Sequence, residues 1–152
     1  MSVTEGDKFS YDGDFHLTHI INNINTGIWE YNISSKEVKW SPGFYNLLGY
    51  EPGEIPPSYD FFFENLLYYE DKPLFLRSIN RHFLEAPETI RVRLLTKESG
   101  YRWFDSTAKR WDDNSVPKIT GSIVDVHDHK VLQLESRHND FLFKETIKIA
   151  TV

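Results

Sequence analysis

The alternation of apolar and polar residues in 88–126, which is strict in 88–96, constrains the fold of this chain more than any other feature. In its first run, ETIRVRLLT, Ile90 and Val92 face one way and Arg91 faces the other. Two more alternating runs follow, after the short polar turns KESG and DDNSVP. A period of two, interrupted by turn residues, indicates three antiparallel strands that bury one face.

The part of the chain before these strands contains a shorter hairpin and several helices. GIWEYNI (27–33) and EVKW (37–40) alternate around an SSK turn and predict two strands. SPGFYNLLGY (41–50) opens with Ser-Pro and stops at a glycine, which is typical of a short helix. Three prolines break 51–71 into short turns, and 71–87 has the spacing of an amphipathic helix that its first aspartate is expected to cap. The order β-β-α-α-α-β-β-β predicts an α+β domain whose helices cover one face of an antiparallel sheet.

Charge and composition exclude several classes of function. The net charge is −6 and no cluster of Lys and Arg stands out, which argues against a nucleic-acid partner. The chain has no cysteine, so disulfides, thiolate metal sites and cysteine nucleophiles are absent. Its apolar runs are too short for a membrane span and its N-terminus lacks the pattern of a signal peptide, so we expect a cytoplasmic location.

Two stretches of the chain resemble the PAS family. They are GIWEYNISSKEVKWSPGFYNLLGYEPGEI near the front and SGYRWFDSTAKRWDDNSVPKITGSIVDVHDHK near the back, and the resemblance covers about residues 26–130. Two departures are visible. The family's usual His-Pro-Asp-Asp before the long helix is YYED (68–71) here, and the threonine of its closing Asp-Ile-Thr motif is replaced by His127. The second departure puts in doubt any signalling role that depends on that hydroxyl.

The resemblance implies a five-stranded antiparallel PAS-like sheet with helices on one face, flanked by an N-terminal and a C-terminal helix. We expect a mobile tail at 1–13, a flanking helix at 14–25, the PAS domain at 26–130 and a signalling or linker helix at 131–152. The family further implies a sensory module without catalytic activity of its own. Such modules belong to larger signalling proteins, typically sensor histidine kinases, so we expect an effector domain in the same polypeptide.

The end of the chain supports a parent protein with several domains. FLFKETIKIATV (141–152) resembles FHLTHIINNINT (15–26), which comes directly before the first predicted strand. We interpret the second copy as the approach to a further PAS repeat. Chance similarity stays the alternative, because the identical positions are few.

The inward faces of the predicted elements supply candidates for a ligand pocket. In PAS proteins the sheet and the helical layer often enclose a pocket, and the small residues Ser106, Ala108 and Gly121 leave space here for a small, mostly apolar ligand. A core that the many aromatic side chains fill completely is the alternative. The pocket candidates are Trp29, Tyr31, Trp40, Phe44, Leu48, Phe62, Phe75, Ile79, Phe83, Val92, Leu94, Phe104, Ser106 and Ile123.

The sequence does not decide whether the protein binds a cofactor, and the favoured interpretation is that it binds none. His82 lies on the predicted helix 71–87, the region from which some haem-binding PAS domains ligate iron, so haem is an alternative. Flavin photochemistry through a cysteinyl adduct is excluded, because the chain has no cysteine. His127, His129 and His138 gather near the predicted exit helix, where a metal site or a pH sensor is conceivable. A solvated surface is the favoured interpretation, and we expect no metal site.

The sheet ends at Asp125, Val126 and His127 and runs directly into a predicted helix, so these residues are candidates for the joint that relays a signal. Asp125 either fixes the angle of that helix through a hydrogen bond or ion pair, or simply caps it. Apolar residues on the outward face of the sheet need cover, which predicts a homodimer. The dimer-surface candidates are Phe15, Ile20, Ile24, Leu95, Trp103 and Val124.

Two other classes of function stay open. The first is a ligand-free protein-interaction and dimerisation module on the same fold, with a solid core. The second is a small α+β enzyme with an aromatic pocket, such as a cone-shaped isomerase. That enzyme would need a buried acid or base, for which the inward faces offer Ser106, Tyr31 and His82.

Overall fold

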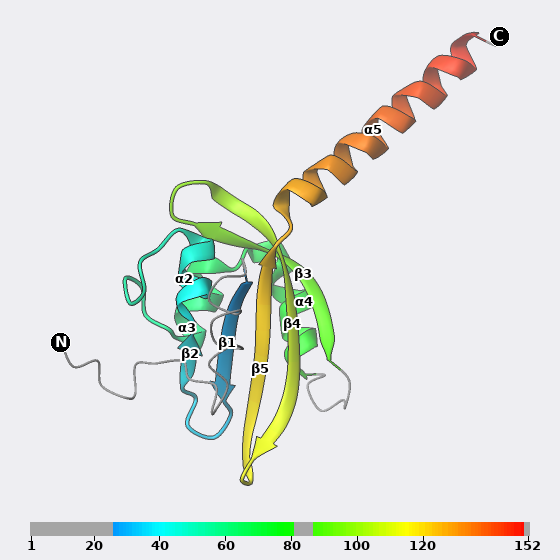
Figure 1. Cartoon of the computed structure of the whole chain (residues 1–152). Coiled ribbons are helices and arrows are strands. Elements are labelled where there is room, and N and C mark those ends of the chain that lie inside the picture. Colours follow the sequence, from blue (N-terminus) through cyan, green and yellow to red (C-terminus); the bar gives the residue numbers. More distant parts are fainter. Residues whose placement is uncertain (1–25, 81–86, 151–152) are drawn as a thin grey trace, which may run out of the picture.

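The computed structural model describes residues 26–80 and 87–150, which form one antiparallel sheet, a layer of short helices and a long C-terminal helix (Figure 1). The five strands lie in the order β2-β1-β5-β4-β3, which confirms the predicted α+β class. In chain order, the elements are β1 (Thr26–Asn32), β2 (Val38–Trp40), α2 (Pro42–Leu48), α3 (Tyr59–Phe61), the π-helical turn η2 (Phe62–Leu66), the 3₁₀ turn η3 (Tyr69–Asp71), α4 (Lys72–Asn80), β3 (Glu88–Thr96), β4 (Gly100–Asp113), β5 (Val116–Asp125) and α5 (His127–Ala150).

The first and last strands pair at the centre of the sheet. β1 runs antiparallel to β5, and its Trp29 lies opposite Gly121. The short strand β2 pairs antiparallel with the other edge of β1, and a tight turn connects the two strands. In this turn the side chain of Asn32 accepts hydrogen bonds from the backbone N–H groups of Ser34 and Ser35, at 3.0 Å each. An asparagine that bonds to the backbone two and three residues ahead is a common way to start such a turn.

Alternation along the strands produces one buried face, as the sequence predicted. In β3, Ile90, Val92 and Leu94 are buried while the intervening residues are partly exposed. Phe104 on β4 and Ile123 on β5 continue that face, and helix α2 packs against it. The buried core consists of Trp40, Phe44, Tyr45, Leu48, Leu66, Leu67, Ile90, Val92, Leu94, Phe104 and Ile123.

Helix α2 is fixed at both ends by features that its sequence predicts. The hydroxyl of Ser41 accepts a hydrogen bond from the N–H of Phe44 at 3.3 Å and another from the N–H of Ile28 at 2.9 Å, so this cap also ties the helix to β1. Gly49 ends the helix in the left-handed conformation, with φ of 84°. The N–H of Lys97 then bonds to the carbonyl of Leu48, which joins the helix end to the end of β3.

Asp71 has a different role from the predicted one. We expected it to cap the helix that follows, but the hydrogen bonds of its carboxylate go to the backbone and side chain of Arg93 on β3. The N–H of Tyr68 also donates to the carbonyl of Arg93 at 3.0 Å. These bonds occupy backbone groups on the outer edge of β3, which would otherwise be free to pair with another strand. The predicted helix 71–87 is described as far as Asn80, and 81–86 lie outside the described residues.

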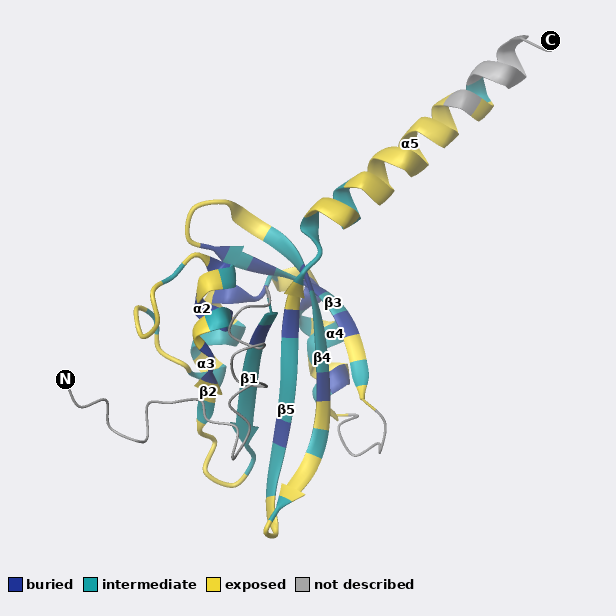
Figure 2. Ribbon diagram, in the orientation of Figure 1, coloured by how far each residue is buried: buried dark blue, intermediate teal, exposed yellow. Residues whose placement is uncertain are grey.

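Helix α5 leaves the end of β5 and projects away from the sheet (Figure 1). It begins at His127, a few residues before the linker boundary expected at 131. Most of its length is exposed, including Leu132, Leu134 and Phe141 (Figure 2). No helix within 26–80 and 87–150 has both the length and the apolar character that crossing a bilayer requires. The predicted tail at 1–13 and the flanking helix at 14–25 lie outside the described residues, so the division into domains stays a prediction.

Candidate functional site

A cavity of about 80 Å³ lies between the buried face of the sheet and the segment that carries α3, η2 and α4. For comparison, an engineered apolar cavity that binds benzene measures about 150 Å³, so this one has space for a few heavy atoms before any side chain moves. The cavity is lined by Trp29, Tyr31, Val38, Trp40, Phe44, Ser58, Tyr59, Phe62, Phe75, Ser78, Ile79, Ile90, Val92, Leu94, Ser106, Ala108, Ile119 and Ile123. No charged side chain is among these described lining residues.

The three serines in the lining differ in their hydrogen bonds. The hydroxyl of Ser58 accepts from the N–H of Phe61 at 3.2 Å and caps α3. The hydroxyl of Ser78 on α4 donates to Glu88 at 3.4 Å. Ser106, in the middle of β4, makes no side-chain hydrogen bond to another described residue. Its hydroxyl is therefore available to a molecule in the cavity.

Aromatic rings close the side of the cavity that lies next to α3. The ring centroid of Tyr59 lies 5.9 Å from that of Tyr31, 6.0 Å from that of Phe63 and 6.2 Å from that of Phe75. Burial raises the pKa of the Tyr59 phenol, and Tyr31 and Asp60 nearby raise it further. A wider surface groove between β2 and α3 adjoins the cavity, and the two share Tyr31, Val38, Ser58 and Tyr59.

The structure places most of the predicted pocket residues around this cavity. These are Trp29, Tyr31, Trp40, Phe44, Phe62, Phe75, Ile79, Val92, Leu94, Ser106 and Ile123. Leu48 and Phe104 do not line it. They are fully buried in the core. Phe83 lies outside the described residues.

Several lining residues escaped the sequence reasoning for different reasons. Ser58 and Tyr59 follow a proline-rich segment without periodicity, so no pattern gives their direction. Ile119 and Ile90 belong to strand faces whose direction the alternation gave correctly, and that alternation could have added them. Ala108 was expected to leave space but was not among the candidate lining residues. The other two residues missed were Val38 and Ser78.

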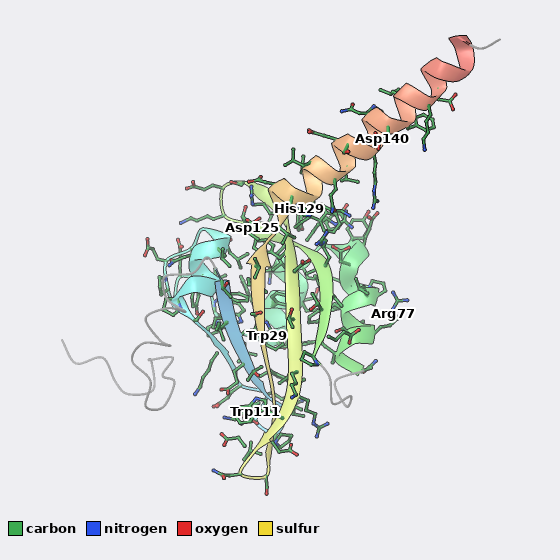
Figure 3. All side chains as sticks on the ribbon, turned by 45° about the vertical axis from the view of Figure 1, so that its right-hand side comes forward. Trp29, Arg77, Trp111, Asp125, His129 and Asp140 are labelled. Carbon is green, nitrogen blue, oxygen red and sulfur yellow. The ribbon has the colours of Figure 1, made fainter. Side chains whose placement is uncertain are left out.

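The joint between the sheet and α5 is a second cluster of specific contacts, at the end of the sheet farthest from Trp111 (Figure 3). Asp125 makes a helix cap and an ion pair at the same time. Its Oδ1 accepts from the N–H of His127 at 2.9 Å, which caps α5, and its Oδ2 accepts from Nε of Arg102 at 2.8 Å. The N–H of Val126 donates to the carbonyl of Trp103 at 2.9 Å, and the N–H of Trp103 donates to Nδ1 of His127 at 3.2 Å. Arg102 on β4 lies opposite Leu94 on β3. The hydrogen bond from its guanidinium to Asp125 raises the pKa of Arg102 above the ordinary range.

The ring of Trp103 connects this joint with the start of α4. The guanidinium of Arg93 lies over the Trp103 ring at 4.6 Å and over the Tyr68 ring at 4.0 Å, while the ammonium of Lys130 on α5 lies 5.3 Å from the Trp103 ring. Arg93 is in turn bound by Asp71, directly before α4. One run of contacts therefore links α4, whose residues line the cavity, to the first turn of α5.

The remaining sequence candidates lie apart from this cluster or outside the described residues. Among the dimer-surface candidates, Leu95 and Trp103 are half-buried and Val124 is 39% exposed, whereas Phe15, Ile20 and Ile24 lie outside the described part. His82, the haem candidate, also lies outside it. His129 bonds to Gln133 along α5, and the described residues contain no group of three or more His, Asp or Glu that could hold a metal ion.

Known proteins resemble this chain in fold. The first is a sensory box histidine kinase/response regulator from Burkholderia thailandensis E264, with a TM-score of 0.70 and 20% identity over 85% of this chain and 98% of that one. The second is the N-terminal domain of a diguanylate cyclase with PAS/PAC sensor from Marinobacter aquaeolei, with a TM-score of 0.59 and 17% identity over 69% of this chain and 98% of that one. The third is a domain of a putative light and redox sensing histidine kinase from Haloarcula marismortui, with a TM-score of 0.55 and 15% identity over 74% of this chain and 99% of that one.

At these identities the likeness to solved structures shows the fold alone. No curated protein sequence matches the chain. The family model of the PAS fold matches residues 37–123, which is more than half of the chain and includes the cavity-lining strands β3, β4 and most of β5. The sequence motifs, the five-stranded sheet and this match agree, and the chain belongs to the PAS fold family.

Proposed function

We propose that this chain is a sensory module that binds a small, neutral, mostly apolar molecule in its cavity and relays the binding to α5. The observation that carries the proposal is the cavity of about 80 Å³, whose lining is apolar except for a few hydroxyls. Because the described lining contains no charged side chain, a charged group would lose its hydration there without gaining a partner. The unpaired hydroxyl of Ser106 would bind one polar atom of the ligand.

The contacts of α4 support a route from the cavity to α5. Phe75, Ser78 and Ile79 on this helix line the cavity, so a ligand that pushes on them shifts the helix. The start of α4 is tied through Asp71 to Arg93, whose guanidinium lies over the ring of Trp103. The backbone of Trp103 bonds to Val126, directly before α5, and to the side chain of His127, its first residue, so a movement of α4 would change the direction of α5.

The relatives support a place for this module inside a larger signalling protein. Two of the three similar structures come from proteins described as histidine kinases and the third from a diguanylate cyclase. We infer a non-catalytic regulatory part, in the cytoplasm, with an effector domain in the same polypeptide. The exposed apolar residues of α5, among them Leu134 and Phe141, support a homodimer in which two copies of this helix pair.

The direct test is ligand binding by the full 152-residue chain. Native mass spectrometry of the purified protein reveals any molecule that co-purifies, and a visible spectrum reveals haem. Binding of 4-fluorophenol and fluorobenzene, followed by ¹⁹F NMR, then probes the cavity with a single neutral ring. A six-membered ring needs more than the cavity of about 80 Å³, so its binding requires the outward movement of α4 proposed above. We expect both probes to bind in this way, and 4-fluorobenzoate, which is charged at pH 7, to be excluded.

Three variants of β4 decide where these probes bind. Ala108→Leu fills the cavity and should abolish binding, whereas Lys109→Leu, at the exposed neighbouring position, should leave it unchanged. Ser106→Ala should weaken 4-fluorophenol about fivefold, the loss of one hydrogen bond, and leave fluorobenzene unaffected. Binding that survives Ala108→Leu would place the probes outside the cavity and contradict the proposal.

A ligand-free interaction and dimerisation module is the second candidate, and the small volume of the cavity favours it. In that case signalling would run through the pairing of α5 alone. A clean mass of two chains, together with no binding of either probe, would support this candidate. The enzyme alternative has no support in the described lining, which offers hydroxyls but no carboxylate, lysine or histidine to act as acid or base.

A further inference from the structure

His127 holds the beginning of α5 to the sheet through its side chain. Its Nδ1 lies 3.2 Å from the backbone nitrogen of Trp103 on β4. A backbone N–H can only donate, so Nδ1 must accept, and an imidazole that accepts at Nδ1 is neutral with its proton on Nε2. The N–H of Val126, the residue directly before α5, donates to the carbonyl of the same Trp103 at 2.9 Å. The side chain of His127 therefore extends the pairing of the sheet by one bond.

Protonation removes this bond. An imidazolium carries a proton on both nitrogens, so Nδ1 would present a donor to the donor of Trp103. The two groups then repel, and the half-buried N–H of Trp103 loses its acceptor. Histidine is the side chain type whose unperturbed charge change lies between about pH 5 and 8, so a pH change over this range is the natural test of the bond.

Charged groups of both signs surround the joint. Asp125 at the end of β5 and Asp128 on α5 are the carboxylates, and Arg102 on β4 lies 2.8 Å from the first and 3.6 Å from the second. Lys130 on α5 and Arg93 on β3 lie over the ring of Trp103. A protonated His127 that turns away from β4 would find Asp125 and Asp128 nearby, in competition with Arg102. The protonated ring of His127 could therefore form an ion pair with one of these carboxylates in place of its bond to Trp103.

We propose that His127 is a proton-operated latch, which fastens the first turn of α5 to β4 when the ring is neutral and releases it when the ring is protonated. The latch needs no molecule in the cavity, so it adds a second input, pH, to the joint through which we propose that ligand binding acts. Because the latch does not depend on a ligand, a negative result for the latch would leave the proposed ligand binding standing, and a negative ligand result would leave the latch standing.

The test follows the amide of Trp103 by ¹⁵N NMR in the full chain between pH 8 and pH 5. Hydrogen exchange, corrected for its intrinsic dependence on pH, should show the protection of this amide falling about fivefold as the ring of His127 takes up its proton. The ring nitrogens of His127 should titrate with the same midpoint as the Trp103 amide shift. His127→Asn is the decisive variant, because the asparagine Oδ1 can occupy the place of Nδ1 and does not titrate.

In His127→Asn the Trp103 amide should stay protected at both pH values. His129→Gln is the matched control in the same turn of α5, since the ring of His129 bonds only along the helix, and it should behave like the wild type. A pair of spin labels on Lys109→Cys/Asn139→Cys, which the absence of native cysteine makes specific, should give a broader distance distribution at pH 5 than at pH 8.

Three results would overturn the latch. They are a Trp103 amide whose protection does not change with pH, a pH transition that persists in His127→Asn, and a His127 ring that titrates with a midpoint different from that of the Trp103 amide. If the His127→Asn variant failed to protect the amide even at pH 8, the comparison of the two midpoints in the wild type would still decide the question.

Discussion

The carboxylate of Asp71 and the guanidinium of Arg93 form two parallel hydrogen bonds, of 3.0 Å from Nε to Oδ2 and 2.8 Å from Nη2 to Oδ1. Oδ2 also accepts from the backbone N–H of Arg93 at 2.7 Å. The side chain of Asp71 is 10% exposed, so this pair is much better shielded from water than an ordinary surface ion pair. It fastens the start of α4 to the edge strand β3.

Removing this carboxylate should therefore be costly. We expect Asp71→Ala to lower the free energy of unfolding by about 2–4 kcal/mol, because the backbone N–H of Arg93 loses its acceptor and the guanidinium keeps only its longer, more exposed contact to Glu70, at 3.4 Å. Asp105→Ala is the control. Asp105 also binds an arginine, Arg91, but on the open face of the sheet, and its loss should cost about 1 kcal/mol or less. Urea unfolding monitored by circular dichroism measures both, and equal losses would contradict the special role of Asp71.

Gly121 allows the ring of Trp29 to lie close to the backbone of β5. A Cβ atom at this position would lie 2.4 Å from the carbonyl oxygen of Thr107 and 2.5 Å from the ring of Trp29. Gly121→Ala should then lower the free energy of unfolding by about 1–3 kcal/mol and push the tryptophan into the cavity that it lines. Ser122→Ala, on the opposite face of the same strand, should change stability by less than about 0.5 kcal/mol. Thermal and urea unfolding would show the difference.

Tyr59 should make the protein sensitive to alkali. Burial raises the pKa of its phenol above the ordinary value of 10.0. The folded protein therefore keeps this proton at a pH where the unfolded chain has released it, so stability is complete below about pH 10 and falls as the pH rises further. We expect Tyr59→Phe to lose less stability than the wild type between about pH 9 and 11. Tyr101→Phe, which removes an exposed phenol, is the control, and an identical pH profile for both variants would refute the assignment.

Pairing of α5 between two copies of the chain is testable by light scattering. Val131, Leu134 and Phe141 lie at intervals of three and seven residues and share one side of the helix, whereas Leu132 lies on another side. Phe141→Glu should weaken dimerisation at least about tenfold, because it introduces a charge into an apolar seam. Leu132→Glu changes an equally exposed leucine and should leave the mass unchanged. A monomeric wild type, or equal effects of the two variants, would argue against this dimer.

The sequence predicted those parts of the molecule whose structure depends on near neighbours. The alternation around Val92 and Leu94 gave the buried face of β3, and Ser41 with Gly49 gave both ends of α2. Each of these features depends on residues within a few positions of each other, where periodicity and capping are informative. The joint after Asp125 was also predictable, because the end of one strand and the start of the next helix are adjacent in the sequence.

The features that the sequence did not give depend on partners far apart in the chain. Asp71 and Arg93 are separated by 22 positions, and Arg102 and Asp125 by 23, so their pairing depends on the register of strands and on the path of η3. Ser58 and Tyr59 were missed from the cavity lining because they follow a proline-rich segment that has no periodicity from which their direction could be predicted. A packed core and an open cavity also have the same apolar pattern, which is why Leu48 and Phe104 could not be distinguished from true lining residues.

The length of α5 has a mechanical consequence. With 24 residues it is about 36 Å long. If it is rigid, a tilt of only about 5° at the joint would move its far end by about 3 Å, which is more than half of the rise of one helical turn. A few hydrogen bonds around Trp103, Asp125 and His127 hold the joint. A small displacement at these bonds would leave the sheet undisturbed. At the far end of α5 the same displacement would be large enough for a neighbouring domain to detect.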